Sequence, residues 1–133
     1  MNTLSTLLQK KISSWSSVKE LINMLSNGDQ NENAGVKETE GVQGSLAGFV
    51  VAEYVRTTKK DIAIVVPTQK ELQDICTDIQ TYDDSVEILE LPWWGTVPYR
   101  AAAKGSIIFG ERASVLAKLC SKCDHPRVFI IQQ

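Results

Sequence analysis

The residue pattern closest to a known chemistry lies in the stretch GVQGSLAG, residues 41–48. A working phosphate-binding loop follows the pattern G-x-x-x-x-G-K-[ST], in which backbone N–H groups surround the phosphates, the lysine neutralises them and the hydroxyl binds magnesium. In the form GxxGSGKT, which helicase-like nucleotide-binding proteins use, Gly41, Gly44 and Ser45 match the first part of the pattern. The positions of the next glycine, the lysine and the threonine are occupied by Leu46, Ala47 and Gly48. The loop therefore keeps the frame of a nucleotide site without its chemical groups.

What remains of this loop binds anions only weakly. A helix N-terminus stabilises an exposed anion by about 0.3 to 1 kcal/mol, which does not replace a lysine and a bound magnesium ion. The preceding stretch VKETEGV is also too polar for the buried strand that usually delivers such a loop. The sequence thus favours a tight turn and a packed helix over nucleotide binding, and we expect no cofactor in this chain.

A second candidate is the aromatic stretch LPWWGTVPYR, residues 91–100. Aromatic side chains stack on exposed bases with about 1 to 3 kcal/mol each, so a nucleic-acid-binding module is one interpretation. Only Arg100 and Lys104 supply positive charge nearby, whereas stacking surfaces usually accompany a cationic track. A rigid loop that folds its aromatic rings onto the domain is the favoured alternative. The possible interaction residues are Trp93, Trp94, Pro98, Tyr99 and Arg100.

The cysteines give half of a zinc signature. Cys120 and Cys123 have the C-x-x-C spacing with which two thiolates share one tetrahedral ion, but no second pair follows. Cys76 falls in another predicted helix, and His125 is the only histidine in the chain. We therefore expect reduced, incidental thiols and no metal site, and one histidine does not anchor a catalytic triad.

The remaining charged groups are expected to be solvated. Glu111 and Arg112 are adjacent on a helix and form at most a weak local ion pair. The acidic pairs lie on a polar helix face and on a turn, with no partner motif: Asp74 with Asp78, and Asp83 with Asp84.

Overall composition limits the class of protein. Fourteen basic and sixteen acidic residues leave a formal charge of −2, so no global field attracts the chain to nucleic acid or to an anionic membrane. With 133 residues and 43% apolar content, it fits one ordinary domain with a real core. No long apolar segment or cleavage site is present, which predicts a cytoplasmic protein without membrane contact. We also expect a monomer.

Hydrophobic periodicity predicts alternating helices and short strands after a helical start. Helices are expected over residues 4–12, 18–25, 45–57, 69–82 and 107–119, and strands over 62–66, 86–91 and 128–131. Thr68 and Glu71 form a capping box at the start of one helix. This alternation predicts an α/β fold with a parallel sheet flanked by helices and right-handed crossovers.

The polar stretch DQNENAGVKETE, residues 29–40, is the best internal boundary. It divides the chain into a helical leader with a polar linker, residues 1–40, and an α/β unit, residues 41–133. The end VFIIQQ stops within or just after a strand without a closing helix, so we expect the chain to be cut from a longer protein.

In order and spacing, these stretches resemble the N-terminal, UvrB-like region of bacterial transcription-repair coupling factors. The resemblance covers about residues 41–133 and rests on GVQGSLAGFVVAEYV, IAIVVPTQKELQDICTDIQTY, the W-x-x-x-P-Y core of PWWGTVPYR, and GERASVLAKL. The chain departs from the W-E-x-L-P-Y-D and S-E-R-L patterns of the family at Gly95, Val97, Arg100 and Ala113.

This resemblance implies a degenerate P-loop, helicase-like lobe that resembles UvrB domain 1a and acts as a non-catalytic scaffold. The family's UvrB-like module helps to recruit UvrA in transcription-coupled nucleotide excision repair. A separate motor in the parent protein uses ATP and magnesium to move on DNA and displace stalled RNA polymerase. The alternative is the nucleotide-binding lobe of an active helicase or UvrB-type ATPase. The main UvrA-binding surface of the family follows this lobe, so no binding residue is assigned here.

Overall fold

The computed structural model describes residues 3–27, 38–93 and 107–133 of the chain. Its elements follow in the order α1 (Thr3–Ser14), α2 (Ser16–Asn27), α3 (Ser45–Thr58), β1 (Ile62–Val66), α4 (Gln69–Tyr82), β2 (Glu87–Leu91), α5 (Ile107–Cys120) and β3 (Arg127–Gln132). The predicted α/β class, with a parallel sheet flanked by helices, is confirmed. Each predicted helix and strand is present within two residues of its expected bounds.

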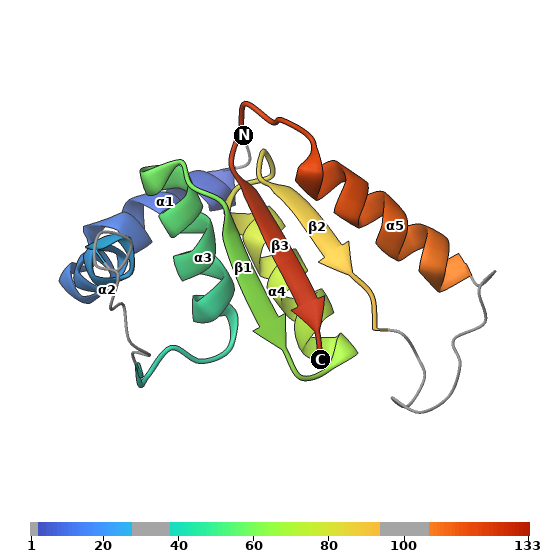
Figure 1. Cartoon of the computed structure of the whole chain (residues 1–133). Coiled ribbons are helices and arrows are strands. Elements are labelled where there is room, and N and C mark those ends of the chain that lie inside the picture. The colour runs from blue at the N-terminus through green and yellow to red at the C-terminus, as the bar shows by residue number, and fades with distance from the viewer. Residues whose placement is uncertain (1–2, 28–37, 94–106) are drawn as a thin grey trace.

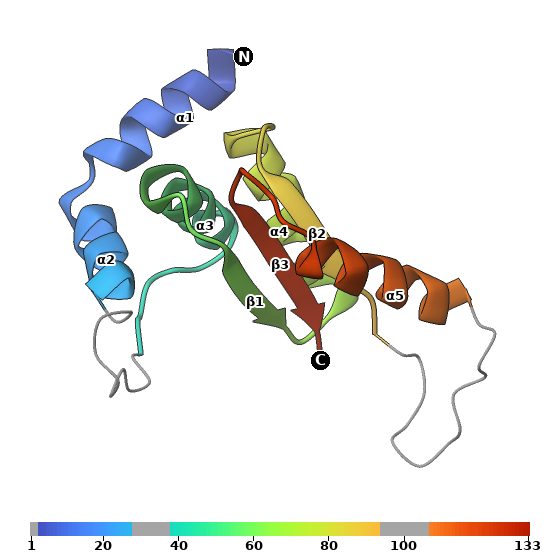
Figure 2. The same ribbon diagram turned by 45° about the horizontal axis from the view of Figure 1, so that its top comes forward.

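The three strands form one parallel sheet in the order β1-β3-β2, so the last strand of the chain is the central one. The connection through α4 passes over the central position, and the connection through α5 returns in the opposite direction. Right-handed crossovers then require the two helices to lie on opposite faces of the sheet. Figure 2 shows this arrangement, with α5 in front of the sheet and α4 behind it.

The main core lies between the sheet and α3 and α4. Residues in register on neighbouring strands share a face, and the face toward α4 carries Ile62, Ile64, Ile88, Val128 and Ile130. Val128 and Ile130 have no exposed surface, because the central strand is covered from both edges and by α4. The opposite face is only partly covered: Val65 is 58% exposed there, and none of the residues of α5 is fully buried.

Helices α1 and α2 share this core with the α/β unit. Ile12, Val18 and Ile22 are buried in the same cluster as residues of α3 and α4. Ser5 Oγ and Gln9 Nε2 donate hydrogen bonds of 2.6 and 2.8 Å to the carbonyl oxygen of Tyr82, at the end of α4. The helical start of the chain therefore supplies packing and a helix C-terminal cap to the unit that follows.

Helix α4 begins as the sequence predicted. The Thr68 hydroxyl accepts a hydrogen bond of 3.2 Å from the Glu71 N–H and donates one of 2.8 Å to the Glu71 carboxylate. Within the described ranges, no helix is long and apolar enough to cross a membrane.

Candidate functional site

The loop that precedes α3 has the glycine-dependent shape that the sequence predicts. Gly41 and Gly44 have φ values of +82° and +58°, a region that other residues rarely adopt. The Ala47 N–H donates to the Gly44 carbonyl at 3.2 Å, which closes the first turn of α3. Residues 38–44 form no strand, in agreement with the polar character of the preceding segment. The glycines therefore shape a turn at the beginning of the helix.

A pocket of about 440 Å³ lies beside this loop, and its charge is wrong for phosphate. Gly44, Ser45 and Ala47 line one side, and α4 contributes Asp74 and Asp78 to the other. Glu71 adds a third carboxylate, and the described lining contains no lysine or arginine. Because like charges repel and no cation compensates, a triphosphate is unfavourable here.

Gly48, at the position where the phosphate-loop pattern has threonine, has a packing role. A Cβ atom at this position would lie 2.5 Å from the Cβ of Asp78, and 3.4 Å from the carbonyl oxygen of Ile75. Helices α3 and α4 thus approach each other at a point where only glycine fits. Leu46 packs at the margin of the core, so these two positions serve packing instead of nucleotide chemistry.

The same helix pair holds a buried carboxylate. Glu53 is 4% exposed and accepts hydrogen bonds from Tyr82 Oη at 2.7 Å and from Arg56 Nε and Nη2 at 2.7 and 2.8 Å. Burial by itself raises the pKa of Glu53, but the bonds from Arg56 and Tyr82 outweigh it and leave this pKa lowered. Burial, with the Glu53 carboxylate, raises the pKa of Tyr82. This network joins α3 to α4 through a buried, hydrogen-bonded carboxylate.

The aromatic stretch falls mostly outside the described residues. Trp93 is 47% exposed, whereas Trp94, Pro98, Tyr99 and Arg100 lie beyond the part of the chain that the structure describes. Next to it, the Arg112 guanidinium donates a hydrogen bond to the Pro92 carbonyl. Arg112 therefore ties α5 to the end of β2, a contact beyond the local pair with Glu111 that the sequence suggested.

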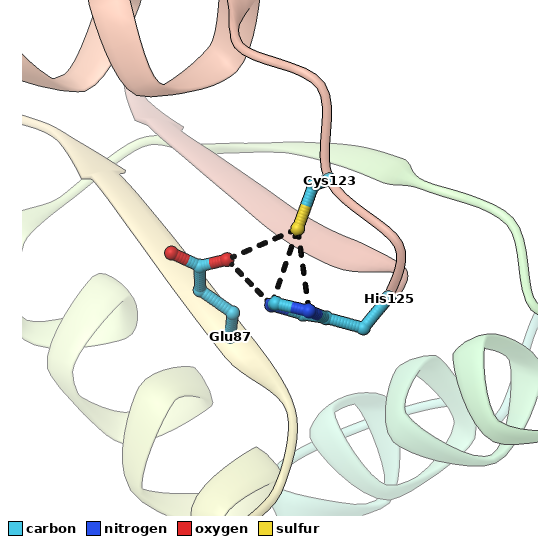
Figure 3. Close-up of side chains that lie close together, drawn as sticks. All are labelled: Glu87, Cys123 and His125. Carbon is cyan, nitrogen blue, oxygen red and sulfur yellow. Dashed lines mark hydrogen bonds and ion pairs between the residues drawn. The ribbon is translucent and has the colours of Figure 1, made fainter.

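The structure brings together three potential metal ligands that the sequence did not connect. Glu87 is the first residue of β2, and Cys123 and His125 lie in the loop between α5 and β3. Their side chains meet at the surface, as Figure 3 shows, and one ligand atom from each lies within 4.8 Å of the others. From the sequence, the C-x-x-C pair with His125 and the distant Cys76 predicted no metal site. Glu87 was not among these candidates, since it is 36 residues from Cys123 along the chain.

The Cys76 thiol is buried, unlike that of Cys123 in this cluster. Burial, together with the nearby Glu90 carboxylate, raises the pKa of Cys76 to about 12. Its Sγ lies 3.4 Å from Glu90 Oε1. Cys76 is therefore a core residue with little thiolate character.

Comparisons with protein-family models, with curated proteins and with solved structures gave no match for this chain.

Proposed function

We propose that this chain is the UvrB-like lobe of a bacterial transcription-repair coupling factor, acting as a non-catalytic scaffold of P-loop-derived, helicase-like architecture. In this proposal the lobe helps to recruit UvrA in the cytoplasm. A separate motor of the parent protein hydrolyses ATP, moves on DNA and displaces stalled RNA polymerase. The chain itself binds no nucleotide and contacts no membrane.

The observation that carries the scaffold proposal is the pocket beside Gly44. The glycines support the bent loop of a phosphate site, yet the pocket presents Glu71, Asp74 and Asp78 to any ligand. Gly48 supports the same conclusion, because its close approach to Asp78 excludes the threonine that would bind magnesium. Both features are expected of a loop whose helix pair was kept after its nucleotide chemistry was lost.

A titration of the chain with Mg-ATP distinguishes the scaffold function from the rival function, an active nucleotide-binding lobe. We expect no saturable heat of binding, because no cation lines the described pocket. Gly44→Val is the matched variant, since φ of +58° is strained for a β-branched residue. Micromolar binding by the wild-type chain that Gly44→Val abolishes would refute the scaffold proposal and support a nucleotide-binding lobe instead.

The repair role is tested in the organism that carries the gene. Disrupting the reading frame is expected to slow removal of ultraviolet lesions from the transcribed strand and to leave the other strand unchanged. Strand-specific mapping of lesions over time measures both rates. Equal kinetics in mutant and wild type on the transcribed strand would refute a role in coupling repair to transcription.

A further inference from the structure

We propose that Glu87, Cys123 and His125 form a binding site for one zinc ion at the edge of β2. His125 Nε2 lies 2.9 Å from Glu87 Oε2, and Cys123 Sγ lies 3.8 Å from the same oxygen. Both ring nitrogens of His125 are 3.3 Å from the sulfur. Figure 3 shows the three side chains pointing toward one another from two separate segments.

The donor set suits zinc. Thiolate, imidazole and carboxylate are its three common protein ligands, with bond lengths of about 2.0 to 2.3 Å. Tetrahedral geometry at those lengths separates ligand atoms by about 3.3 to 3.7 Å. The observed separations of 2.9, 3.3 and 3.8 Å are each within about half an ångström of that range. Three protein ligands leave the fourth position to water, as in open zinc sites.

One side chain must turn when the ion binds. A sulfur equally distant from both ring nitrogens lies over the face of the imidazole, instead of in line with one nitrogen lone pair. Rotation of the His125 ring, whose side chain is 59% exposed, brings one nitrogen toward the shared position. Binding also releases the Cys123 thiol proton to solvent, because the thiolate is the ligand.

The backbone that carries these ligands is held in place. Arg127 pairs with Glu87 in the sheet register, and its N–H donates to Asp61 Oδ1 at 2.8 Å. The Arg127 guanidinium donates to Asp61 Oδ2 at 3.0 Å and to the carbonyl oxygens of Lys118 and Ser121 at 2.8 and 3.4 Å. The loop that contains Cys123 and His125 is therefore fastened at both ends, which lowers the ordering cost of binding.

The surrounding charges permit a cation. Arg127 is one nearby positive charge, and its guanidinium is paired with the Asp61 carboxylate. Lys122, next to Cys123 in the chain, is exposed to solvent. Glu87 supplies the carboxylate of the cluster.

A Cys–His–carboxylate arrangement also occurs in nucleophilic enzymes, but two features disfavour that use here. The side chains of His125 and Glu87 are 59% and 35% exposed, and three cavities in the described part of the chain are lined without Cys123 or His125. A covalent mechanism needs a bound substrate and donors for its oxyanion. Metal binding requires only the three ligands themselves.

The test is metal titration of the chain after chelator dialysis under reducing conditions. Zinc affinity is measured by competition with a chromogenic chelator, and cobalt reports the ligands by absorption. We expect one ion per chain, with a thiolate-to-cobalt charge-transfer band and visible bands of tetrahedral intensity. Cys123→Ser, His125→Ala and Glu87→Gln are each expected to weaken binding at least about 10-fold, since even changing a residue that only hydrogen-bonds to a metal ligand costs that much.

Cys120→Ser is the matched control, because it removes an exposed thiol three residues from Cys123 and should leave affinity unchanged. Circular dichroism of each variant checks folding. Three results would overturn the proposal: no binding by the wild-type chain, binding retained in Cys123→Ser, or binding lost in Cys120→Ser but kept in Glu87→Gln. The outcome is independent of the scaffold function.

Discussion

Replacing Tyr82 by phenylalanine tests whether the buried network between α3 and α4 stabilises the fold. The change removes only the hydroxyl that donates to Glu53 at 2.7 Å, and it keeps the ring, which lies 5.8 Å from the Phe49 ring between centroids. A hydrogen bond to a charged group contributes about 1.5 to 3 kcal/mol. We expect the free energy of unfolding to fall by that amount at neutral pH, measured by urea denaturation with an unchanged m value.

Tyr54→Phe is the control for this substitution. Tyr54 is 7% exposed in the same core, and its hydroxyl has no hydrogen bond within the described residues. Its loss should therefore change stability by less than about 0.5 kcal/mol. Equal costs for the two substitutions would refute the argument, because the Glu53 bond would then contribute nothing beyond an ordinary buried tyrosine.

The pH dependence gives a second check on the same network. The folded pKa of Glu53 is below its ordinary value of 4.5, so the carboxylate contributes stability that is present above pH 4.5. That stability is lost as the pH falls through the lowered folded value. The difference between wild type and Tyr82→Phe should therefore shrink on acidification. A constant difference would mean that the tyrosine bond does not depend on the charge of Glu53.

Three further predictions follow from individual contacts. Gly48→Ala should lower the free energy of unfolding by about 1 to 3 kcal/mol through overpacking. Gly110→Ala, with nothing within 4 Å of the new Cβ, should raise it by up to about 1 kcal/mol. Urea denaturation measures both changes, and equal effects would contradict the close approach of α3 and α4. Thr68→Ala should cost about 1 kcal/mol in the same assay, and no loss would mean that the capping box contributes nothing. Cys76, with a pKa of about 12, holds about a thousandfold less thiolate than a thiol whose pKa is 9.0, so iodoacetamide should label it far more slowly than Cys120. Peptide mass spectrometry measures the two labelling rates. Equal rates in the native chain would contradict the burial of Cys76.

The local elements could be predicted because their signals are local. The capping box at Thr68, the apolar spacing along α4 and the run Ile62–Val66 each need only a few neighbouring residues to be read. The strand order could not be predicted in this way, because alternating strands and helices predict parallel pairing without indicating which strand is central. The apolar run VFII in β3 is the sequence signal that agrees with a central strand, since Val128 and Ile130 are fully buried.

The loop before α3 was partly predictable for a similar reason. The absence of lysine and threonine can be read from the sequence, but the carboxylates that face the loop come from α4 and depend on helix packing. Gly48 is the clearest case. The sequence presents it as a missing threonine, whereas the structure presents it as the residue on which the contact between α3 and α4 depends.

The Glu87, Cys123 and His125 cluster follows from the strand order that the sequence could not supply. Because β3 lies between β1 and β2, the residues that begin the two edge strands both approach the loop that enters β3. Asp61, just before β1, binds Arg127 from one side, and Glu87, at the start of β2, reaches the loop from the other. Had β2 paired with β1 instead, Asp61 and Glu87 would not flank Arg127 from opposite edges. The C-x-x-C spacing therefore indicates Cys120 as the partner of Cys123, whereas the topology brings Cys123 to a carboxylate on a neighbouring strand.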